Sequence, residues 1–313
     1  MDCLYIVVPC YNEQEVITET TRRLTEKLDR LVDEHIISVN SKIMYVDDGS
    51  KDNTYNIIKK LKEDNPYITA VKLSHNRGHQ NALLAGLETA KEYADVIISM
   101  DCDLQDDINA VDQMLSKYYD GCDIVYGVRS SREKDTAFKR NTAQMFYKLM
   151  EFMGAEIVYN HADYRLMSKR SVIALSEYGE VNLFLRGIVP MLGYKCDTVY
   201  YERGERFAGK SKYPLKKMIN FALDGITSLT IKPIRLILAL GILIFLVSIA
   251  MLIYFMAIHF MGKTVQGWTT VVVSVWAIGG LQLLATGIIG EYLGKIYLET
   301  KKRPRYTIEE ILL

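Results

Sequence analysis

The stretch D-V-I-I-S-M-D-C-D-L-Q-D-D, residues 95–107, joins an apolar run to a cluster of carboxylates. The apolar run predicts a β-strand, so the carboxylates lie at its carboxyl end, where open α/β sheets bind their ligands. Carboxylates crowded onto one turn repel each other, and Mg²⁺ relieves the repulsion because it takes one or two carboxylates together with phosphate oxygens and water. The stretch therefore predicts a metal–diphosphate site and a nucleotide-activated substrate. The alternative is a solvated acidic turn that opens a helix near Asn109, where aspartates are favoured.

Strand-like and helix-like segments alternate along the chain on both sides of this stretch. We expect helices over about residues 13–31, 54–63, a segment after Gly78, and 109–119, and strands over 4–9, 43–46, 68–73, 95–100 and 123–126. Such alternation predicts an α/β fold with a mainly parallel sheet and helices on both faces. After about Gly127 the pattern loosens into charged segments that we expect to be helical.

Polar residues follow several of the expected strands. Pro9 to Glu13 end the first strand, Asp47 to Ser50 end the second, and the acidic stretch ends the fourth. Because the carboxyl ends of parallel strands share one edge of a sheet, we expect these segments to converge on one site. Asp47 and Asp48 can accept hydrogen bonds from a base or a ribose, and Gly49 lets the backbone turn tightly. Taken alone, Asp-Gly-Ser is also a common sequence in turns that have no binding function.

Charge and hydropathy narrow the class of protein. The 313 residues include 38 basic and 38 acidic ones, and the resulting formal charge of zero does not point to nucleic acid as a partner. The mean hydropathy of +0.03 is high for a soluble enzyme, and the apolar excess lies in two uncharged spans, residues 236–258 and 264–290. Each exceeds the roughly 20 residues needed to cross a bilayer, so the sequence predicts a two-helix transmembrane hairpin. Two buried core helices would need more protein around them than this region provides.

Positive charges flank the predicted hairpin. Lys232 and Arg235 precede it, five lysines and arginines follow it between residues 295 and 305, and the connecting loop carries only Lys263. The positive-inside rule then places both chain ends in the cytoplasm. We expect no cleavable signal sequence, and the five dispersed cysteines fit reduced cytosolic thiols.

A basic segment precedes the hairpin. Residues 202–217 hold six basic and two acidic side chains, a net +4. Such a surface attracts anionic headgroups, although ordinary juxtamembrane charge bias explains it equally well. We therefore divide the chain into a catalytic domain (1–202), a basic juxtamembrane segment (203–235), the hairpin (236–293) and a cytoplasmic C-terminal tail (294–313).

Residues 204–211, G-E-R-F-A-G-K-S, match the P-loop pattern G-x-x-x-x-G-K-[ST] and follow a strand-like run, 196–201. A P-loop NTPase needs further parallel strands and a second aspartate on Mg²⁺. Here the chain between the motif and the predicted membrane span has room for only about one helix, and Pro214 follows the motif. We interpret the segment instead as basic backbone that holds a lipid phosphate.

The motifs taken together resemble those of family 2 glycosyltransferases of the GT-A, Rossmann-like fold. They are V-P-C-Y-N-E (8–13), V-D-D-G-S-K-D-N-T (46–54), N-R-G-H-Q-N-A-L-L-A-G (76–86) and D-C-D-L-Q-D (101–106). The later A-D-Y-R-L-M (162–167) and R-F-A-G-K-S-K-Y (206–213), followed by the two spans, look like the polyprenyl-phosphate branch, which includes dolichol-phosphate mannose synthase and bactoprenol glucosyltransferases. The chain departs from that pattern at Cys102, where alanine is common, and at Asp107-Ile108, where two prolines are frequent.

The resemblance implies an inverting transferase that moves a sugar from a nucleotide diphosphate, UDP-glucose or UDP-GlcNAc, to undecaprenyl or another polyprenyl phosphate. It implies a bacterial plasma-membrane protein that crosses the membrane more than once and can form homo-oligomers. The cofactor would be Mg²⁺ or Mn²⁺, held by Asp103 and Gln105. The residues that match the family's nucleotide-sugar pocket are Pro9, Tyr11, Glu13, Asp48, Arg77, Asp101 and Arg129.

The acceptor is an unusual nucleophile. A phosphate monoester is largely dianionic at pH 7, so it needs less base catalysis than a sugar hydroxyl. Its repulsion from the diphosphate can be offset by basic and hydroxyl side chains, for which we name Arg140, Arg206, Ser211 and Lys212. Asp163 matches the residue proposed as the catalytic base in this family. A structural role, as the ion-pair partner of Arg165 or as a helix cap, explains it equally well.

Two other classes of protein share parts of the pattern. A processive polysaccharide synthase also carries Asp-Asp-Gly and Asp-x-Asp, but it would show Gln-x-x-Arg-Trp and more spans, neither of which occurs here. A non-catalytic membrane scaffold could keep the fold, but the intact metal motif argues against it.

Overall fold

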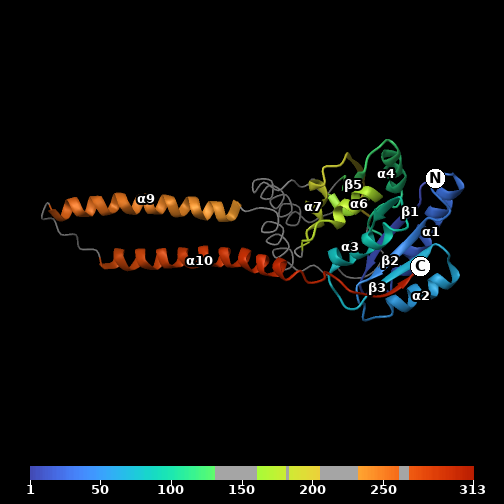
Figure 1. The fold of residues 1–313 in the computed structure, drawn as a ribbon, viewed down its shortest axis with the longest axis horizontal. Helices are drawn as coiled ribbons and strands as arrows, with labels where there is room; N and C mark the ends of the chain where they lie inside the picture. Colours follow the sequence, from blue (N-terminus) through green and yellow to red (C-terminus); the bar gives the residue numbers. More distant parts are fainter. Residues whose placement is uncertain (131–160, 181–182, 205–231, 261–267) are drawn as a thin grey trace.

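The computed structural model describes residues 1–130, 161–180, 183–204, 232–260 and 268–313. Within these residues an α/β domain stands at one end of the molecule and a pair of long helices extends from it (Figure 1). Eight described strands form one sheet in the order β7-β5-β6-β4-β1-β2-β3-β8. They are β1 (Leu4–Cys10), β2 (Lys42–Asp47), β3 (Ile68–Leu73), β4 (Val96–Ser99), β5 (Ile124–Arg129), β6 (His161–Ser168), β7 (Cys196–Tyr201) and β8 (Ile308–Leu312).

The four strands β3, β2, β1 and β4 are parallel neighbours at the centre of the sheet. β1 is buried along its whole length, which explains why its sequence is a continuous apolar run rather than an alternating one. The register places Cys10 beside Asp47 and Val7 beside Ser99. Consequently the polar segments after β1, β2 and β4 emerge at the same edge, as we predicted from the parallel arrangement.

Helices cover both faces of the sheet, which confirms the predicted α/β, Rossmann-like architecture. One face carries α1 (Ile17–Asp33), α2 (Thr54–Asp64) and α4 (Ala110–Tyr119), and the other carries α3 (His79–Ala90), α6 (Lys169–Ser176) and α7 (Leu185–Met191). Alternate residues of β1 divide between the two cores. Ile6 and Val8 lie in the first, and Tyr5 and Val7 lie in the second.

Close packing of α3 on the sheet depends on Gly86. A Cβ atom at this position would lie 2.4 Å from Cγ1 of Val7 and 2.6 Å from Cγ2 of Val46. Because Gly86 has no side chain, α3 can pack closely against the central strands. This packing holds the first residues of α3 at the carboxyl edge, where the polar segments meet.

The sheet is mixed: β3, β2, β1 and β4 are parallel and β5 pairs in parallel with β7, as predicted for a mainly parallel sheet, whereas β6 and β8 run antiparallel to their neighbours. β6 lies antiparallel between β4 and β5, in a region for which we predicted charged helices, and that prediction was wrong for residues 161–168. The sequence A-D-Y-R-L-M is therefore a buried central strand. Its polar side chains are carried into the middle of the sheet.

The chain end also joins the sheet. β8 pairs antiparallel with β3, and two ion pairs reinforce the edge, Lys72 Nζ to Glu309 Oε1 at 2.8 Å and Lys59 Nζ to Glu310 Oε1 at 2.9 Å. The segment 294–313, which we predicted to be a separate tail, thus contains a strand of the catalytic sheet. The chain returns to the α/β domain after the long helices (Figure 1).

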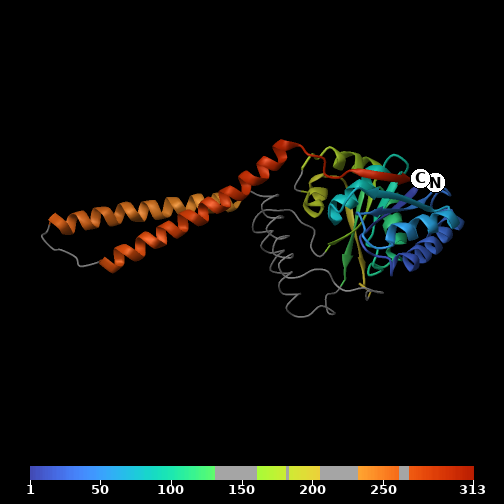
Figure 2. The same cartoon turned by 90° about the horizontal axis from the view of Figure 1, so that it is seen from below.

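The two long helices are α9 (Lys232–Phe260) and α10 (Trp268–Lys301), and they lie side by side in both views (Figures 1 and 2). They contain the predicted spans, except that residues 264–267 lie outside the described part of the chain. Over the described residues alone, no helix meets the combined requirements of length and apolar character for crossing a membrane. The transmembrane hairpin therefore stays a prediction.

Candidate functional site

The acidic loop, residues 100–109, connects β4 to α4 at the carboxyl edge of the sheet. The amide of Met100 donates to the carbonyl of Val7 at 3.0 Å, so the loop leaves the sheet directly beside β1. Thr20 Oγ1 on α1 donates to the Cys102 carbonyl at 2.8 Å, and this hydrogen bond holds the loop against α1. Leu104 adopts a φ of 58°, a left-handed conformation that is uncommon for a residue with a side chain.

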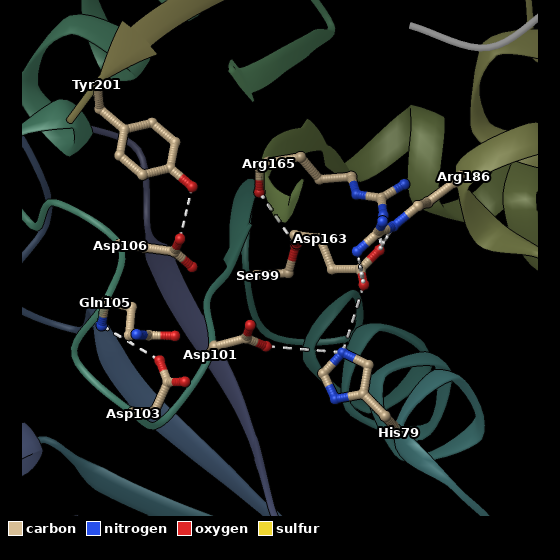
Figure 3. Close-up of polar contacts among 10 residues, drawn as sticks. All are labelled: His79, Ser99, Asp101, Asp103, Gln105, Asp106, Asp163, Arg165, Arg186 and Tyr201. Atoms are coloured by element: carbon tan, nitrogen blue, oxygen red, sulfur yellow. Dashed lines mark hydrogen bonds and ion pairs between the residues drawn. The ribbon is translucent and has the colours of Figure 1, made fainter. Parts of the chain in front are cut away.

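Asp103 and Gln105 lie next to each other in this loop (Figure 3). The carboxylate of Asp103 accepts the Gln105 amide hydrogen at 3.1 Å, the turn that aspartate commonly makes with the residue two positions ahead. Asp103 is buried, with 7% of its surface exposed. The two predicted metal ligands are thus brought together.

These ligands suit a cation that is shared with a diphosphate. Among the described residues, no group of three or more histidine, cysteine, aspartate or glutamate side chains forms a complete metal site. One carboxylate and one amide oxygen are enough for a hard cation that completes its shell with phosphate oxygens and water. The residues present therefore fit a cation that arrives with, or is completed by, a phosphorylated ligand.

Asp106, a buried residue of the acidic loop, forms a polar group with Tyr201 and Arg129. The hydroxyl of Tyr201 donates to Asp106 Oδ1 at 2.5 Å, whereas Asp106 Oδ2 has no partner among the described residues (Figure 3). The Nε atom of Arg129 is also buried and lacks a partner within the described part of the chain. Burial, with Asp101 adding to it, raises the pKa of Asp106 to about 6. Orphaned atoms of this kind mark a place where a water or ligand is expected.

Asp163, on β6, occupies a different environment. Its carboxylate accepts hydrogen bonds from Arg165 at 2.8 Å and from Arg186 at 3.0 and 3.2 Å. His79, the first residue of α3, approaches with Nε2 3.6 Å from Asp163 and 3.7 Å from Asp101 (Figure 3). We call Asp163, Arg165, Arg186 and His79 the Asp163 cluster. The imidazole of His79 links this cluster to Asp101 of the acidic loop.

The charges of the cluster stabilise one another. Burial alone would raise the pKa of Asp163, but the two arginines and His79 outweigh it and hold this pKa well below its usual value. For His79, burial opposes the charged form, and the two carboxylates outweigh burial and raise its pKa to about 9. Arg165 is only 1% exposed and also donates to the Leu185 carbonyl at 3.4 Å. The alternative that the sequence left open for Asp163, an ion pair with Arg165, is present.

The segment after β2 supports the start of α3. The carboxylate of Asp48 accepts hydrogen bonds from the amides of Arg77 and Gly78 at 2.7 and 2.9 Å, and burial raises the pKa of Asp48. A Cβ atom at Gly49, where φ is +64°, would lie 2.7 Å from the backbone of His75 and Asn76. This contact requires glycine, and it explains why Asp-Gly follows the strand.

The remaining nucleotide-pocket candidates lie at the same edge. Pro9 is within β1, Tyr11 and Glu13 follow it, and the Glu13 amide donates to Thr54 Oγ1 at 2.9 Å. The structure brings these together with Asp48, Arg77, Asp101 and Arg129 at the ends of neighbouring strands. The acceptor-phosphate candidates Arg140, Arg206, Ser211 and Lys212, and most of the P-loop-like motif, lie outside the described residues.

Sequence reasoning missed four side chains that the structure places here. Arg186 and His79 bind Asp163, Tyr201 binds Asp106, and Arg203 donates to Gln105 Oε1. His79 stood within the N-R-G-H-Q-N motif directly before the expected helix, so its position was available as a signal. The positions of Tyr201 and Arg203 follow from the pairing of β7 with β5, and that of Arg186 follows from the packing of α7 beside α3.

The sequence model of glycosyl transferase family 2 matches residues 5–175. An uncharacterized glycosyltransferase of Bacillus subtilis, YkoT, is 53% identical over 306 residues, which cover 98% of this chain and 91% of that protein. A prophage bactoprenol glucosyl transferase homolog of Escherichia coli is 37% identical and covers 98% of both chains. The bactoprenol glucosyl transferase of Shigella phage SfX is 38% identical, covering 97% of this chain and 98% of that protein.

Proposed function

Since the chain belongs to glycosyl transferase family 2 and is a glycosyltransferase, we propose that it moves a sugar from a nucleotide diphosphate sugar to a polyprenyl phosphate. The donor would be UDP-glucose or UDP-GlcNAc, and the acceptor would be undecaprenyl phosphate at the cytoplasmic face of the plasma membrane. The observation that carries this proposal is the similarity, along nearly the whole chain, to proteins named bactoprenol glucosyl transferase.

Asp103 and Gln105 would hold a divalent cation, Mg²⁺ or Mn²⁺. When bound, such a cation neutralises the charge that develops on the diphosphate as the sugar leaves. The half-buried side chain of Arg129, whose buried Nε has no partner among the described residues, supports a role in binding the same diphosphate. Asp48, by contrast, uses both carboxylate oxygens to hold the backbone of residues 77–78. We therefore propose that it shapes the nucleotide pocket through that loop.

The proposed acceptor explains why a strong base is unnecessary. A phosphate monoester has its second pKa near 6, so it is already nucleophilic at neutral pH. A carboxylate whose pKa lies well below its usual value, as that of Asp163 does, is a weak base. We propose that Asp163 orients Arg186 and His79 toward the substrates, and that it does not remove a proton.

Membrane anchoring is the second part of the proposal. The uncharged spans lie within helices of 29 and 34 residues, and apolar side chains such as Leu238, Ile253 and Leu283 are 63%, 63% and 76% exposed. Exposed apolar surface of this extent needs a covering, and a bilayer would provide it. A hairpin of this kind would hold the carboxyl edge of the sheet near the lipid phosphate.

A screen of nucleotide sugars tests the proposal. Purified full-length protein in detergent is incubated with Mn²⁺, undecaprenyl phosphate and each of several nucleotide sugars, and lipid products are identified by mass. We expect one hexose or N-acetylhexosamine to be added to the lipid phosphate. Dolichyl phosphate serves as a second acceptor. Release of UDP without a lipid product from either acceptor would contradict the proposed acceptor class.

A further inference from the structure

The segment that follows β7 contacts the proposed metal ligand Gln105 through two hydrogen bonds. The amide of Gly204 donates to the Gln105 carbonyl at 2.8 Å, and Nη2 of Arg203 donates to the side-chain oxygen Oε1 of the same residue. In this arrangement a guanidinium group occupies the oxygen that would bind the cation. From the sequence we predicted for Arg203 only a contribution to the charge of the basic segment.

Arg203 is held between opposing charges. Burial and the neighbouring Arg129 lower its pKa, whereas Asp103 and Asp106 act in the opposite direction. The Nε atoms of both arginines are buried and have no partner in the described part of the chain. Two adjacent guanidinium groups with unused donors make a site for an anion, because guanidinium pairs with phosphate through several hydrogen bonds at once.

We propose that Arg203 competes with the divalent cation for Gln105, and that it turns to the diphosphate of the donor once the cation is bound. The inference rests on the proposed function, since it assumes a cation at Asp103 and Gln105 and a diphosphate beside it. The exchange follows from electrostatics: two cations near one amide oxygen repel each other, and the repulsion is stronger in a partly buried site than in water. A diphosphate would satisfy both orphaned Nε atoms and remove the repulsion between the arginines.

Two binding measurements with Arg203→Met test the exchange. Full-length protein in detergent is titrated with Mn²⁺ alone, and free Mn²⁺ is followed by electron paramagnetic resonance. Because the competing charge is gone, we expect the Mn²⁺ dissociation constant to fall about tenfold relative to wild type. UDP is then titrated by calorimetry at saturating Mn²⁺, and we expect its dissociation constant to rise about tenfold because charged hydrogen bonds to phosphate are lost.

The opposite directions of the two changes separate this role from a structural one. If Arg203 only supported the loop, Arg203→Met would weaken Mn²⁺ binding and UDP binding together. Arg203→Lys keeps the charge and loses the planar fork, so it should bind Mn²⁺ as wild type does and recover only part of the UDP affinity. Arg170→Met is the matched control, because Arg170 is an exposed arginine that pairs with Asp123 in a separate ion pair; neither affinity should change.

Asp103→Asn distinguishes a failure of this inference from a failure of the proposed function. If wild type binds no more Mn²⁺ than Asp103→Asn does, the proposed metal site is wrong, and the inference is overturned with it. If wild-type binding depends on Asp103 but Arg203→Met leaves the Mn²⁺ affinity unchanged or weakens it, the proposed function survives and the inference alone is overturned.

Discussion

The acidic loop and the Asp163 cluster lie side by side at the carboxyl edge of the sheet, and their buried carboxylates, Asp106 and Asp163, differ in how fully they are hydrogen-bonded (Figure 3). In the loop, Asp106 Oδ2 has no partner among the described residues, and neither do the Nε atoms of Arg129 and Arg203, which lie beside the loop. In the cluster, both oxygens of Asp163 accept hydrogen bonds from arginine, and the buried atom without a partner in the described part of the chain is Nε of Arg165.

This difference indicates separate tasks for the two regions. An incompletely paired polar group is costly when buried, unless a ligand completes it. A fully paired carboxylate instead fixes the side chains around it. We therefore assign ligand binding to the acidic loop and the positioning of other groups to the Asp163 cluster. The predictions that follow test this division.

The largest effect on activity should come from Asp103→Asn. The substitution keeps the size of the side chain but removes the charge that a divalent cation requires, so we expect turnover to fall by about a hundredfold or more. The thermal unfolding midpoint, followed by circular dichroism, should change little. EDTA should abolish activity of the wild type reversibly, and full activity in EDTA would contradict a metal role for the loop.

The largest effect on stability should come from Asp163→Asn. Arg165 is 1% exposed, and the loss of its carboxylate partner leaves a buried charge uncompensated, which costs about 3 kcal/mol in the free energy of unfolding. Asp123→Asn is the matched control. The side chain of Asp123 is also buried, but its partner Arg170 is 68% exposed and can turn to water, so a loss of about 1 kcal/mol is expected. Equal losses for the two variants would contradict the positioning role of Asp163.

The pH dependence of stability should have opposite signs in the two regions. The pKa of Asp106 is raised to about 6, so this residue favours the folded state below about pH 4, and that contribution is lost as the pH rises through 6. The pKa of Asp163 is lowered, so its contribution is present above about pH 4 and is lost as the pH falls.

Unfolding measured from pH 4 to 8 in EDTA checks this prediction. Relative to Asp106→Asn, the wild type should lose about 2 kcal/mol of stability between pH 4 and 7. Relative to Asp163→Asn, it should not lose stability between pH 4 and 6, below the range in which His79 titrates. A pH-independent difference between wild type and Asp106→Asn would show that Asp106 is not held in the environment described here.

The same division explains what the sequence could and could not predict. The acidic loop and the segments after β1 and β2 were found because each follows a parallel strand, and parallel strands share an edge regardless of loop details. β6 was missed because Asp163 and Arg165 make it look like an exposed segment. Their ion pair with each other, together with the contact of Arg186 with Asp163, allows these charges to be buried on a strand that lies between β4 and β5.

Long-range pairing also hid the other missing parts. β8 pairs with β3 across more than two hundred residues of sequence, and nothing local in the chain distinguishes this strand from a charged tail. Arg186 reaches Asp163 only because α7 packs near the start of α3, where Gln80 Oε1 accepts the Leu185 amide hydrogen at 2.8 Å. Such contacts carry no signature in spacing or composition.

Crystals of the full-length protein grown with Mn²⁺ and UDP would test the central claim most directly. Anomalous difference density at the manganese edge locates the cation without prior assumptions about its ligands. We expect one strong peak in direct contact with the carboxylate of Asp103, with the diphosphate beside Arg129 and no metal on Asp163. A peak coordinated by Asp163, or a bound diphosphate with no metal at Asp103, would contradict the assignment of ligand binding to the acidic loop.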